Sequence, residues 1–291
     1  MSSMSAPNTM HTTGKAPSGG VNIAYRLFGA QSKPGNAPLI IVHGLSYFSY
    51  DWIEVAAALA GERQVAAMDM RGFGDSDWPG EYGVPAMAAD LVALMDHLGW
   101  DKAVLVGHSM GGRSCTWCAA EMPQRVAGLV LVDYSPDNAP GGSKRVATTV
   151  AGTPELFASI DEAIQWSGTD PHSPQGVHLR ARFKAYLKPV AGGFMLKRDP
   201  HFAKQFRHQL ATGERHKLGV DLWDALARIS MPVLALRGTR SDMFAAETVP
   251  KLRAANAQIA LVEVDSGHNV AGDNPQALLR EVRGYLAEPR N

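Results

Sequence analysis

One short segment combines a serine with the glycines needed to expose it for reaction. Val106 to Gly112 reads V-G-H-S-M-G-G; it follows an apolar run and precedes a stretch with helical spacing. Gly107 and Gly111 lack side chains, so the chain can turn sharply and hold the Ser109 hydroxyl exposed in a strained conformation. Free N–H groups at the start of a helix favour an oxyanion, and the Met110 N–H is the first donor expected. The pattern predicts a nucleophilic serine.

A second oxyanion donor is expected upstream, where the apolar run at residues 38–43 leads into His43-Gly44-Leu45. Gly44 permits a turn at the end of this predicted strand, and the Leu45 N–H is the candidate donor. His43 precedes the turn, which favours a structural or pocket-shaping role over the role of a base. We therefore expect His43, Gly44 and the nearby Tyr47 to line the substrate pocket.

The general base is expected from the late part of the chain. His268 lies in D-S-G-H-N, directly after the last predicted strand, where a glycine-containing loop can place its imidazole over the sheet edge. The near-neutral pKa of histidine lets it take a proton from the serine and return it. His108 is adjacent to Ser109 on a tight turn, so its ring is expected to point away from the hydroxyl. His268 is the predicted base.

Two carboxylates at strand ends could orient this imidazole. Asp242 follows a predicted strand within R-G-T-R-S-D-M-F, and Asp133 ends the run V-A-G-L-V-L-V-D. Either side chain could hold His268 in the required tautomer and stabilise the imidazolium. The residues and their positions leave both candidates open.

The chain resembles the α/β-hydrolase superfamily. The landmarks are H-G-L, D-M-R-G-F-G-D-S-D, G-H-S-M-G-G and a late G-H, and the resemblance runs from about Asn22 to Leu286. In that family the acid most often follows the strand before the last, which implies Asp242; a minority use the end of the preceding strand, here Asp133. The usual position of the acid, three residues after the strand-end glycine, holds Ser241, with Asp242 one residue further on. The resemblance implies a Ser-His-Asp triad with Asp242 preferred.

Short apolar runs alternate with segments of helical spacing along most of the chain. This alternation is typical of an α/β fold in which a mostly parallel sheet is covered by helices on both faces. Buried strands are predicted at residues 38–43, 64–70, 102–107, 126–133, 232–237 and 259–264, and an edge strand at 22–28. Helices are predicted at residues 51–60, 85–98, 110–121, 221–229, 249–255 and 275–286.

The stretch from 135 to 220 interrupts this rhythm because it contains no strong strand signal. It is too long for an ordinary loop, so we expect a helical cap inserted between the two parts of an α/β-hydrolase core, residues 21–134 and 221–291. The cap aromatics Trp166 and Phe194 are candidates for lining an apolar pocket over the serine. Residues 1–20 are rich in Ser, Thr, Gly and Pro and are expected to form a flexible tail.

Composition narrows the classes of partner. Lys and Arg total 28 and equal Asp and Glu, so no basic stripe is available for nucleic acid. No window approaches the roughly 18 apolar residues of a membrane span, and the N-terminus lacks the apolar core of a secretory signal. We therefore expect a soluble, cytoplasmic protein with a small-molecule substrate and neither nucleic-acid nor membrane partners. The sequence carries no sign of a particular oligomeric state.

Cofactor and metal sites are not expected. Cys115 and Cys118 have C-x-x-C spacing but lie within a predicted helix, which favours two buried helix residues over a redox pair or zinc ligands. The glycine-rich stretch from Met70 to Asp77 does not form G-x-G-x-x-G and no phosphate-binding lysine follows it, which indicates a structural turn.

These residues predict hydrolysis of a carboxylic ester or lactone of a small, largely apolar substrate, through an acyl-enzyme on Ser109. A fold does not fix chemistry, and the superfamily that the chain resembles offers alternatives on the same triad: a C–C bond hydrolase, a perhydrolase or haloperoxidase-like enzyme. A non-catalytic ligand-binding member is a further alternative. Dehalogenases and epoxide hydrolases place Asp where this chain has Ser109, which argues against those two activities.

Overall fold

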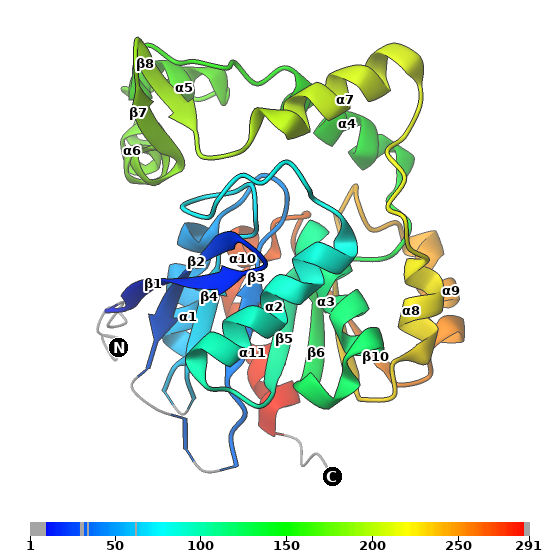
Figure 1. Cartoon of the computed structure of the whole chain (residues 1–291). Coiled ribbons are helices and arrows are strands. Elements are labelled where there is room, and N and C mark those ends of the chain that lie inside the picture. Colours follow the sequence, from blue (N-terminus) through cyan, green and yellow to red (C-terminus); the bar gives the residue numbers. More distant parts are fainter. Residues whose placement is uncertain (1–9, 30–31, 34, 62, 288–291) are drawn as a thin grey trace, which may run out of the picture.

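A single large sheet organises the chain. The computed structural model describes residues 10–29, 32–33, 35–61 and 63–287 (Figure 1). Eight strands pair in the order β1-β2-β4-β3-β5-β6-β9-β10, while β7 and β8 form a separate pair. From β4 to β10 all neighbouring strands run parallel, and only β1 and β2 join antiparallel. The mostly parallel sheet predicted from the apolar runs is confirmed.

The strands of the large sheet are short, and six of them coincide with the predicted buried runs. In chain order they are β1 (Thr12–Ser18), β2 (Val21–Phe28), β3 (Leu39–Val42), β4 (Val65–Met68), β5 (Ala103–His108), β6 (Val126–Val132), β9 (Val233–Gly238) and β10 (Ile259–Val264).

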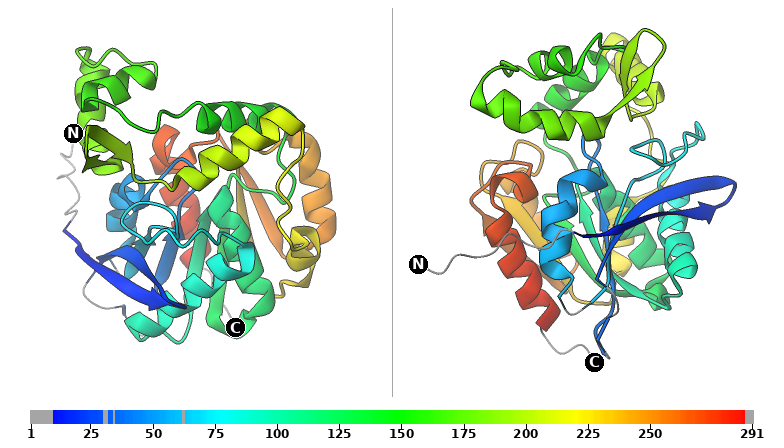
Figure 2. Two further views of the ribbon diagram at one scale, coloured as in Figure 1. Left: turned by 45° about the horizontal axis from the view of Figure 1, so that its top comes forward. Right: turned by 90° about the vertical axis from the view of Figure 1, so that its left-hand side faces the viewer.

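Helices cover both faces of the sheet, as Figure 2 shows. One face packs against α2 (Val84–Leu98), α3 (Met110–Glu121), α8 (Leu222–Arg228) and α9 (Val249–Ala255). The other face packs against α1 (Ile53–Leu59) and α11 (Pro275–Ala287), with the short α10 (Val270–Asp273) at one end. The side chains between sheet and helices form two extended apolar cores, which fix the strand ends in space.

The carboxyl ends of the parallel strands meet at one edge of the sheet, the usual site of function in open α/β sheets. The turns after β3, β5, β6, β9 and β10 bring Gly44, Ser109, Asp133, Ser241 and His268 to this edge. The edge faces the inserted segment between β6 and α8 (Figure 1).

The N-terminal region differs from the flexible tail expected for residues 1–20. Residues 12–18 form strand β1, which pairs with β2 through a two-residue turn. Gly19 and Gly20 have φ values of 55° and 89°, the left-handed conformation that such hairpins need. Ala16 is buried on the core, and the Ser18 hydroxyl donates to Asp90. The expectation of a flexible tail was wrong for residues 12–18, because the Gly19-Gly20 turn closes a hairpin between β1 and β2. Residues 1–9 lie outside the described ranges.

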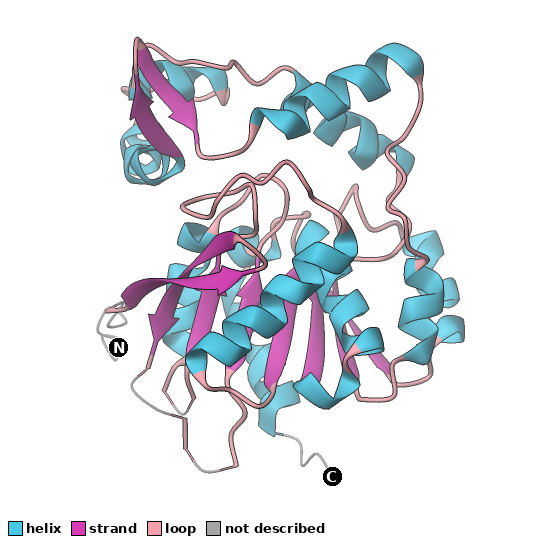
Figure 3. Ribbon diagram, in the orientation of Figure 1, coloured by secondary structure: helices cyan, strands magenta, loops and turns pink. Residues whose placement is uncertain are grey.

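The cap, residues 135–220, is mostly helical but also contains a hairpin (Figure 3). Its helices are α4 (Pro140–Ala151), α5 (Ile160–Trp166), α6 (Pro174–Tyr186) and α7 (Pro200–Thr212). Strands β7 (Leu187–Val190) and β8 (Gly193–Leu196) pair antiparallel and were not predicted, because each has only four residues and β7 contains a proline. Among the described helices of the protein, none has the length and apolar content to span a bilayer.

Candidate active site

The nucleophile turn has the strained geometry that the sequence predicts. Ser109 has φ 51° and ψ −117° and occupies the position directly before α3. A Cβ on Gly107 would lie 2.8 Å from the Cα of Gly112, and one on Gly111 would lie 2.5 Å from the backbone oxygen of Val42. Only glycine fits at these two positions, so the turn packs directly against the end of β3.

His268 connects the serine to a carboxylate. Its Nε2 lies 2.9 Å from the Ser109 hydroxyl oxygen, and its Nδ1 lies 2.6 Å from Oδ2 of Asp133. A carboxylate can only accept, so the imidazole donates from Nδ1 and leaves Nε2 free to accept the hydroxyl proton. The imidazole is only 13% exposed, which shields this chain of hydrogen bonds from water.

Asp133 is buried, and both of its carboxylate oxygens accept hydrogen bonds. Its Oδ1 accepts the Gly238 N–H at 2.7 Å, and its Oδ2 accepts the Ser241 hydroxyl as well as the imidazole. Asp133 also has a positive φ of 45°, so the backbone is turned to bring the carboxylate under His268. Three donors from two different loops hold this carboxylate in place.

The preferred acid, Asp242, does not make the expected contact with His268. Its carboxylate instead forms two hydrogen bonds with the Arg145 guanidinium of α4, at 2.5 and 2.8 Å, and is 43% exposed. These bonds lower the pKa of Asp242. The preference for Asp242 was therefore wrong about the imidazole's partner. The physical reason is the one-residue offset: Ser241 occupies the usual position and donates to Asp133.

The two candidate oxyanion donors border the serine. The Tyr47 N–H donates to the Gly44 oxygen at 3.1 Å and closes a tight turn that contains Leu45. A Cβ on Gly44 would lie 3.1 Å from the Ser109 Cβ, so this turn lies against the nucleophile. Within the described ranges, neither the Leu45 N–H nor the Met110 N–H donates to another residue of the protein. Both are available to a bound oxygen.

Two further histidines are buried behind the site and have structural contacts. His43 accepts the Met70 N–H at Nε2 and contacts the Gly44 oxygen through Nδ1 at 2.7 Å. His108 Nε2 donates to the backbone oxygen of His268 at 2.9 Å, so its ring is directed away from the serine hydroxyl. Burial lowers the pKa of His43, and burial lowers the pKa of His108 to about 3. Both rings are therefore neutral at ordinary pH.

The cap is bonded to the turn that carries Leu45. Asp51 accepts the Phe48 N–H at 2.9 Å, and the same carboxylate accepts the Tyr186 hydroxyl and pairs with Arg182 at 2.9 Å. The Arg182 guanidinium donates to the Tyr186 hydroxyl and lies 5.7 Å from the centre of the Tyr47 ring. Sequence reasoning missed this cluster because α6 is far from the turn in the chain.

The expected pocket residues separate into two groups. Gly44 and Tyr47 lie at the site edge and His43 is fully buried behind it, whereas Trp166 and Phe194 contact Phe157 within the cap. The Trp166 ring lies 5.8 Å from that of Phe157, and Phe194 pairs with Phe157 through backbone hydrogen bonds. Phe157 and Phe194 belong to the small apolar core of the cap, and Trp166 is 37% exposed at its surface, so the structure does not support Trp166 and Phe194 as a roof over Ser109.

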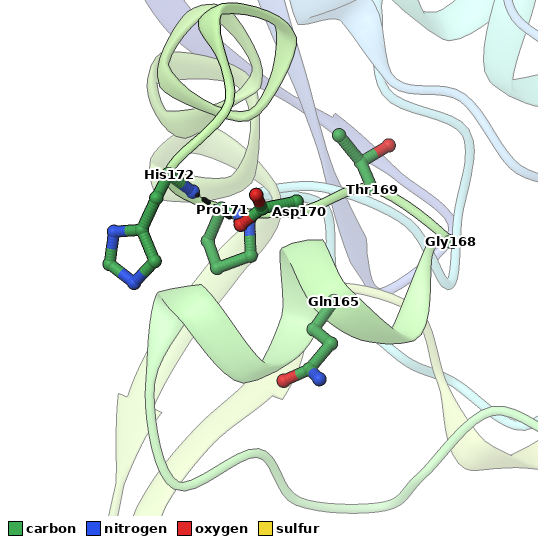
Figure 4. Close-up of a pocket in the computed structure, with 6 residues that line it drawn as sticks. All are labelled: Gln165, Gly168, Thr169, Asp170, Pro171 and His172. Atoms are coloured by element: carbon green, nitrogen blue, oxygen red, sulfur yellow. Dashed lines mark hydrogen bonds between the residues drawn. The ribbon is translucent and has the colours of Figure 1, made fainter.

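A surface hollow on the cap is also unrelated to the serine. It is formed by the end of α5 and the connection to α6 (Figure 4) and contains none of the residues bonded to Ser109. Its lining residues are Gln165, Gly168, Thr169, Asp170, Pro171 and His172.

Residues for a metal or redox centre do not gather at the site. Across the described ranges, no group of three or more His, Cys, Asp or Glu side chains is arranged to hold a metal ion. Cys115 and Cys118 are buried in α3, as predicted. Burial raises the pKa of Cys118 to about 12, so its thiol stays protonated and unreactive.

Comparisons with known proteins agree with the observed fold. The family model described as "alpha/beta hydrolase fold" matches residues 37–275. A 3-hydroxybutyrate-oligomer hydrolase of Cupriavidus necator is 32% identical over 270 residues, covering 87% of this chain and 89% of that protein. An Escherichia coli esterase, YbfF, is 29% identical over 265 residues, covering 88% of this chain and 96% of that protein. The crystal structure of E-2-(acetamidomethylene)succinate hydrolase superposes with a TM-score of 0.81 at 24% identity, covering 96% of this chain and all of that one.

Proposed function

Because this chain belongs to the alpha/beta hydrolase fold family, we propose that it hydrolyses a carboxylic ester or lactone through Ser109, His268 and Asp133. The observation that carries the proposal is the unbroken line of hydrogen bonds from the serine hydroxyl through the imidazole to the buried carboxylate. This arrangement activates a serine for attack on a carbonyl carbon. The proposed acid follows β6, the strand after the one that leads to Ser109, which is the less common of the two acid positions in the family.

In the first step the Ser109 oxygen attacks the carbonyl carbon while His268 Nε2 takes its proton. Asp133 stabilises the imidazolium through Nδ1, and its three donors hold the carboxylate in place. The developing oxyanion accepts from the Leu45 and Met110 N–H groups, which are preorganised and free. The tetrahedral intermediate then expels the alcohol, which receives the proton from Nε2.

The second step releases the acid. Water attacks the acyl-enzyme with His268 again as the base, the same donors stabilise the second oxyanion, and the Ser109 oxygen leaves with the proton from Nε2. For a lactone the alcohol and the acid are one molecule, so ring opening and acyl-enzyme hydrolysis give a single hydroxy acid.

The names of two relatives support an ester as the bond cleaved. A 3-hydroxybutyrate oligomer is by its name a chain of hydroxy-acid units, and the YbfF relative is an esterase. The serine at position 109 supports an acyl-enzyme, because the hydroxyl gives an ester intermediate that the bonded imidazole can resolve with water.

Turnover of p-nitrophenyl esters of increasing acyl length tests the proposal. Ser109→Ala and His268→Ala should each lower kcat/KM by roughly four to six orders of magnitude, because members of a triad act as a unit. Circular dichroism and the melting temperature control for folding. A loss of at most tenfold in either variant would contradict the assignment.

A further inference from the structure

Arg113 lies one helical turn after the nucleophile, and its side chain is only partly exposed. In α3 the neighbouring residues Gly111, Gly112 and Ser114 are buried, whereas Met110 and Arg113 are not. Residues three apart share a helix face, and helical side chains lean toward the N-terminus of their helix. The Arg113 side chain therefore leans toward the sheet edge that carries Ser109 and the Met110 N–H.

Arg113 has no counterion. Within the described part of the chain it forms no hydrogen bond or ion pair, whereas Arg145 and Arg182 at the same edge are paired with Asp242 and Asp51. Burial lowers the pKa of Arg113, and the nearby Tyr134 only partly offsets this effect. Tyr134 follows Asp133 directly in sequence, and its ring packs against the first turn of α3, where a Cβ on Gly112 would lie 2.4 Å from the Tyr134 Cγ. Arg113, the next residue of α3, therefore begins close to the strand end that carries Asp133.

The cap closes over this side of α3. His216 lies in the segment that returns from α7 to α8, and burial lowers its pKa, with smaller contributions from His201 and from the Arg113 charge. Arg113 thus lies where the nucleophile helix meets the cap. A partly exposed guanidinium that has no anion within the described residues is free to pair with an anion of a bound molecule.

We propose that Arg113 binds a carboxylate group of the substrate, so that the enzyme prefers esters of acid-bearing molecules, such as monoesters of dicarboxylic acids or esters of hydroxy acids. This inference rests on the proposed ester hydrolysis and names its substrate class. The planar guanidinium offers two parallel donors to a carboxylate, and the nearby start of α3 adds a favourable field for negative charge. The anion would anchor the substrate while its ester carbonyl reaches Ser109.

Matched ester pairs test this charge recognition. In the first pair, monoethyl succinate carries the anion on the acyl side, and ethyl 4-oxopentanoate is its neutral counterpart. In the second pair, 3-acetoxybutyrate carries the anion on the alcohol side, and the methyl ester of 3-acetoxybutyrate is its neutral counterpart. The wild type should favour the anionic member of at least one pair. Arg113→Gln should lower kcat/KM for that member about 100-fold and change the neutral member by less than about threefold. Arg113→Lys keeps the positive charge but lacks the two parallel donors of the guanidinium, so its kcat/KM for the anionic member should fall about tenfold.

Arg207→Gln is the matched control, because Arg207 is an exposed arginine of α7 that pairs with Glu155. It should leave the preference between the paired esters unchanged. Equal losses on the anionic and neutral members in Arg113→Gln would show a purely structural role and overturn the proposal. An unchanged preference in Arg113→Gln would overturn it as well.

A binding measurement separates this proposal from the proposed function. Butyrate and its neutral analogue butanamide are tested as protectants against labelling of Ser109 by a fluorophosphonate. Butyrate should protect the wild type at a concentration at least tenfold lower than butanamide, and Arg113→Gln should abolish this difference. Wild-type protection that does not distinguish the two compounds would refute the carboxylate site even if esters are hydrolysed. Absence of labelling and of ester turnover would instead refute the hydrolase proposal.

Discussion

The carboxyl edge of the sheet and the cap above it are built in different ways. At the sheet edge, glycine backbones approach their neighbours so closely that no Cβ would fit, and the buried Asp133 takes donors from two loops. The cap has a small apolar core of its own, centred on Phe157 and Phe183, and its arginines make partly exposed ion pairs such as Arg180 with Asp161. The sheet edge therefore holds the proposed reacting groups in one geometry, while differences in the cap can change which substrates reach those groups.

The contacts between these two regions are both apolar and polar. Phe202 of α7 and Tyr186 of α6 pack against core rings, Phe202 at 4.7 Å from Phe73 and Tyr186 at 4.3 Å from Phe48. Asp51 and the residues of α6 bind the turn containing Leu45, and Arg145 of α4 binds Asp242 beside the histidine loop. Lys188 of the cap hairpin lies 3.5 Å from the centre of the Trp78 ring of the core. The comparison predicts large effects for changes within the sheet edge and smaller effects for changes at its contacts with the cap.

The largest difference is expected between the two candidate carboxylates. Asp133→Asn should lower kcat by about 10⁴-fold, because the amide cannot hold the imidazole in the required tautomer or stabilise its cation. Asp242→Asn should stay within about threefold, since its partner is Arg145 at the cap. Steady-state kinetics on one p-nitrophenyl ester measures both. A larger loss in Asp242→Asn than in Asp133→Asn would reverse the assignment of the acid.

Acid should destabilise the core through its buried histidines. The folded pKa of His108 is about 3, below its ordinary value of 6.5. Between these values the unfolded chain binds a proton that the folded chain excludes, so the stability is complete above pH 6.5 and falls as the pH drops toward 3. At pH 5 the loss from this one group is about 2 kcal/mol.

Urea unfolding at pH 7 and pH 5 measures this loss. The decrease in unfolding free energy between the two values should be smaller in His108→Asn by about 2 kcal/mol than in the wild type. His178→Asn is the control from the cap, because that histidine is exposed. Identical pH dependence in His108→Asn and the wild type would contradict the role of burial.

A smaller effect is expected at the contact between α6 and the oxyanion turn. Tyr186→Phe removes the hydroxyl that donates to Asp51 and should lower kcat about tenfold with KM within twofold, because the turn would hold the Leu45 N–H less firmly in the transition state. Lys188→Met, which removes a cap contact away from this turn, should change neither constant. A change confined to KM in Tyr186→Phe would show that the contact only shapes the pocket.

The strained turn at Ser109, the turn at Gly44 beside it and the position of His268 could be predicted because each depends on local chain geometry. A sharp turn after a strand needs glycine at Gly107 and Gly111, and a base must come from a loop at the same sheet edge, which His268 satisfies. The choice between Asp133 and Asp242 could not be predicted, because both end neighbouring strands and only the packed loops decide which carboxylate lies under the imidazole.

The cap was the least predictable region, because the packing of segments that are distant in the chain decides its contacts. Its aromatics fit either a pocket lining or a separate core, and the backbone pairing of Phe157 with Phe194 puts Phe194 in the cap core, while Trp166 is 37% exposed. The pairing of Arg182 and Tyr186 with Asp51 joins residues more than 130 positions apart, which no local pattern reports. Strand β1 is a different case. The Gly-Gly turn signal is present in the sequence, but the polar composition around it favoured the expectation of a flexible tail.

The activation of Ser109 as a nucleophile is most directly tested by mass spectrometry after brief treatment with a fluorophosphonate. The wild type should carry one adduct, on the peptide that contains Ser109, and His268→Ala should acquire it at least 100-fold more slowly because the serine loses its base. An adduct on another residue, or equal labelling rates in the wild type and His268→Ala, would contradict an activated serine at this turn.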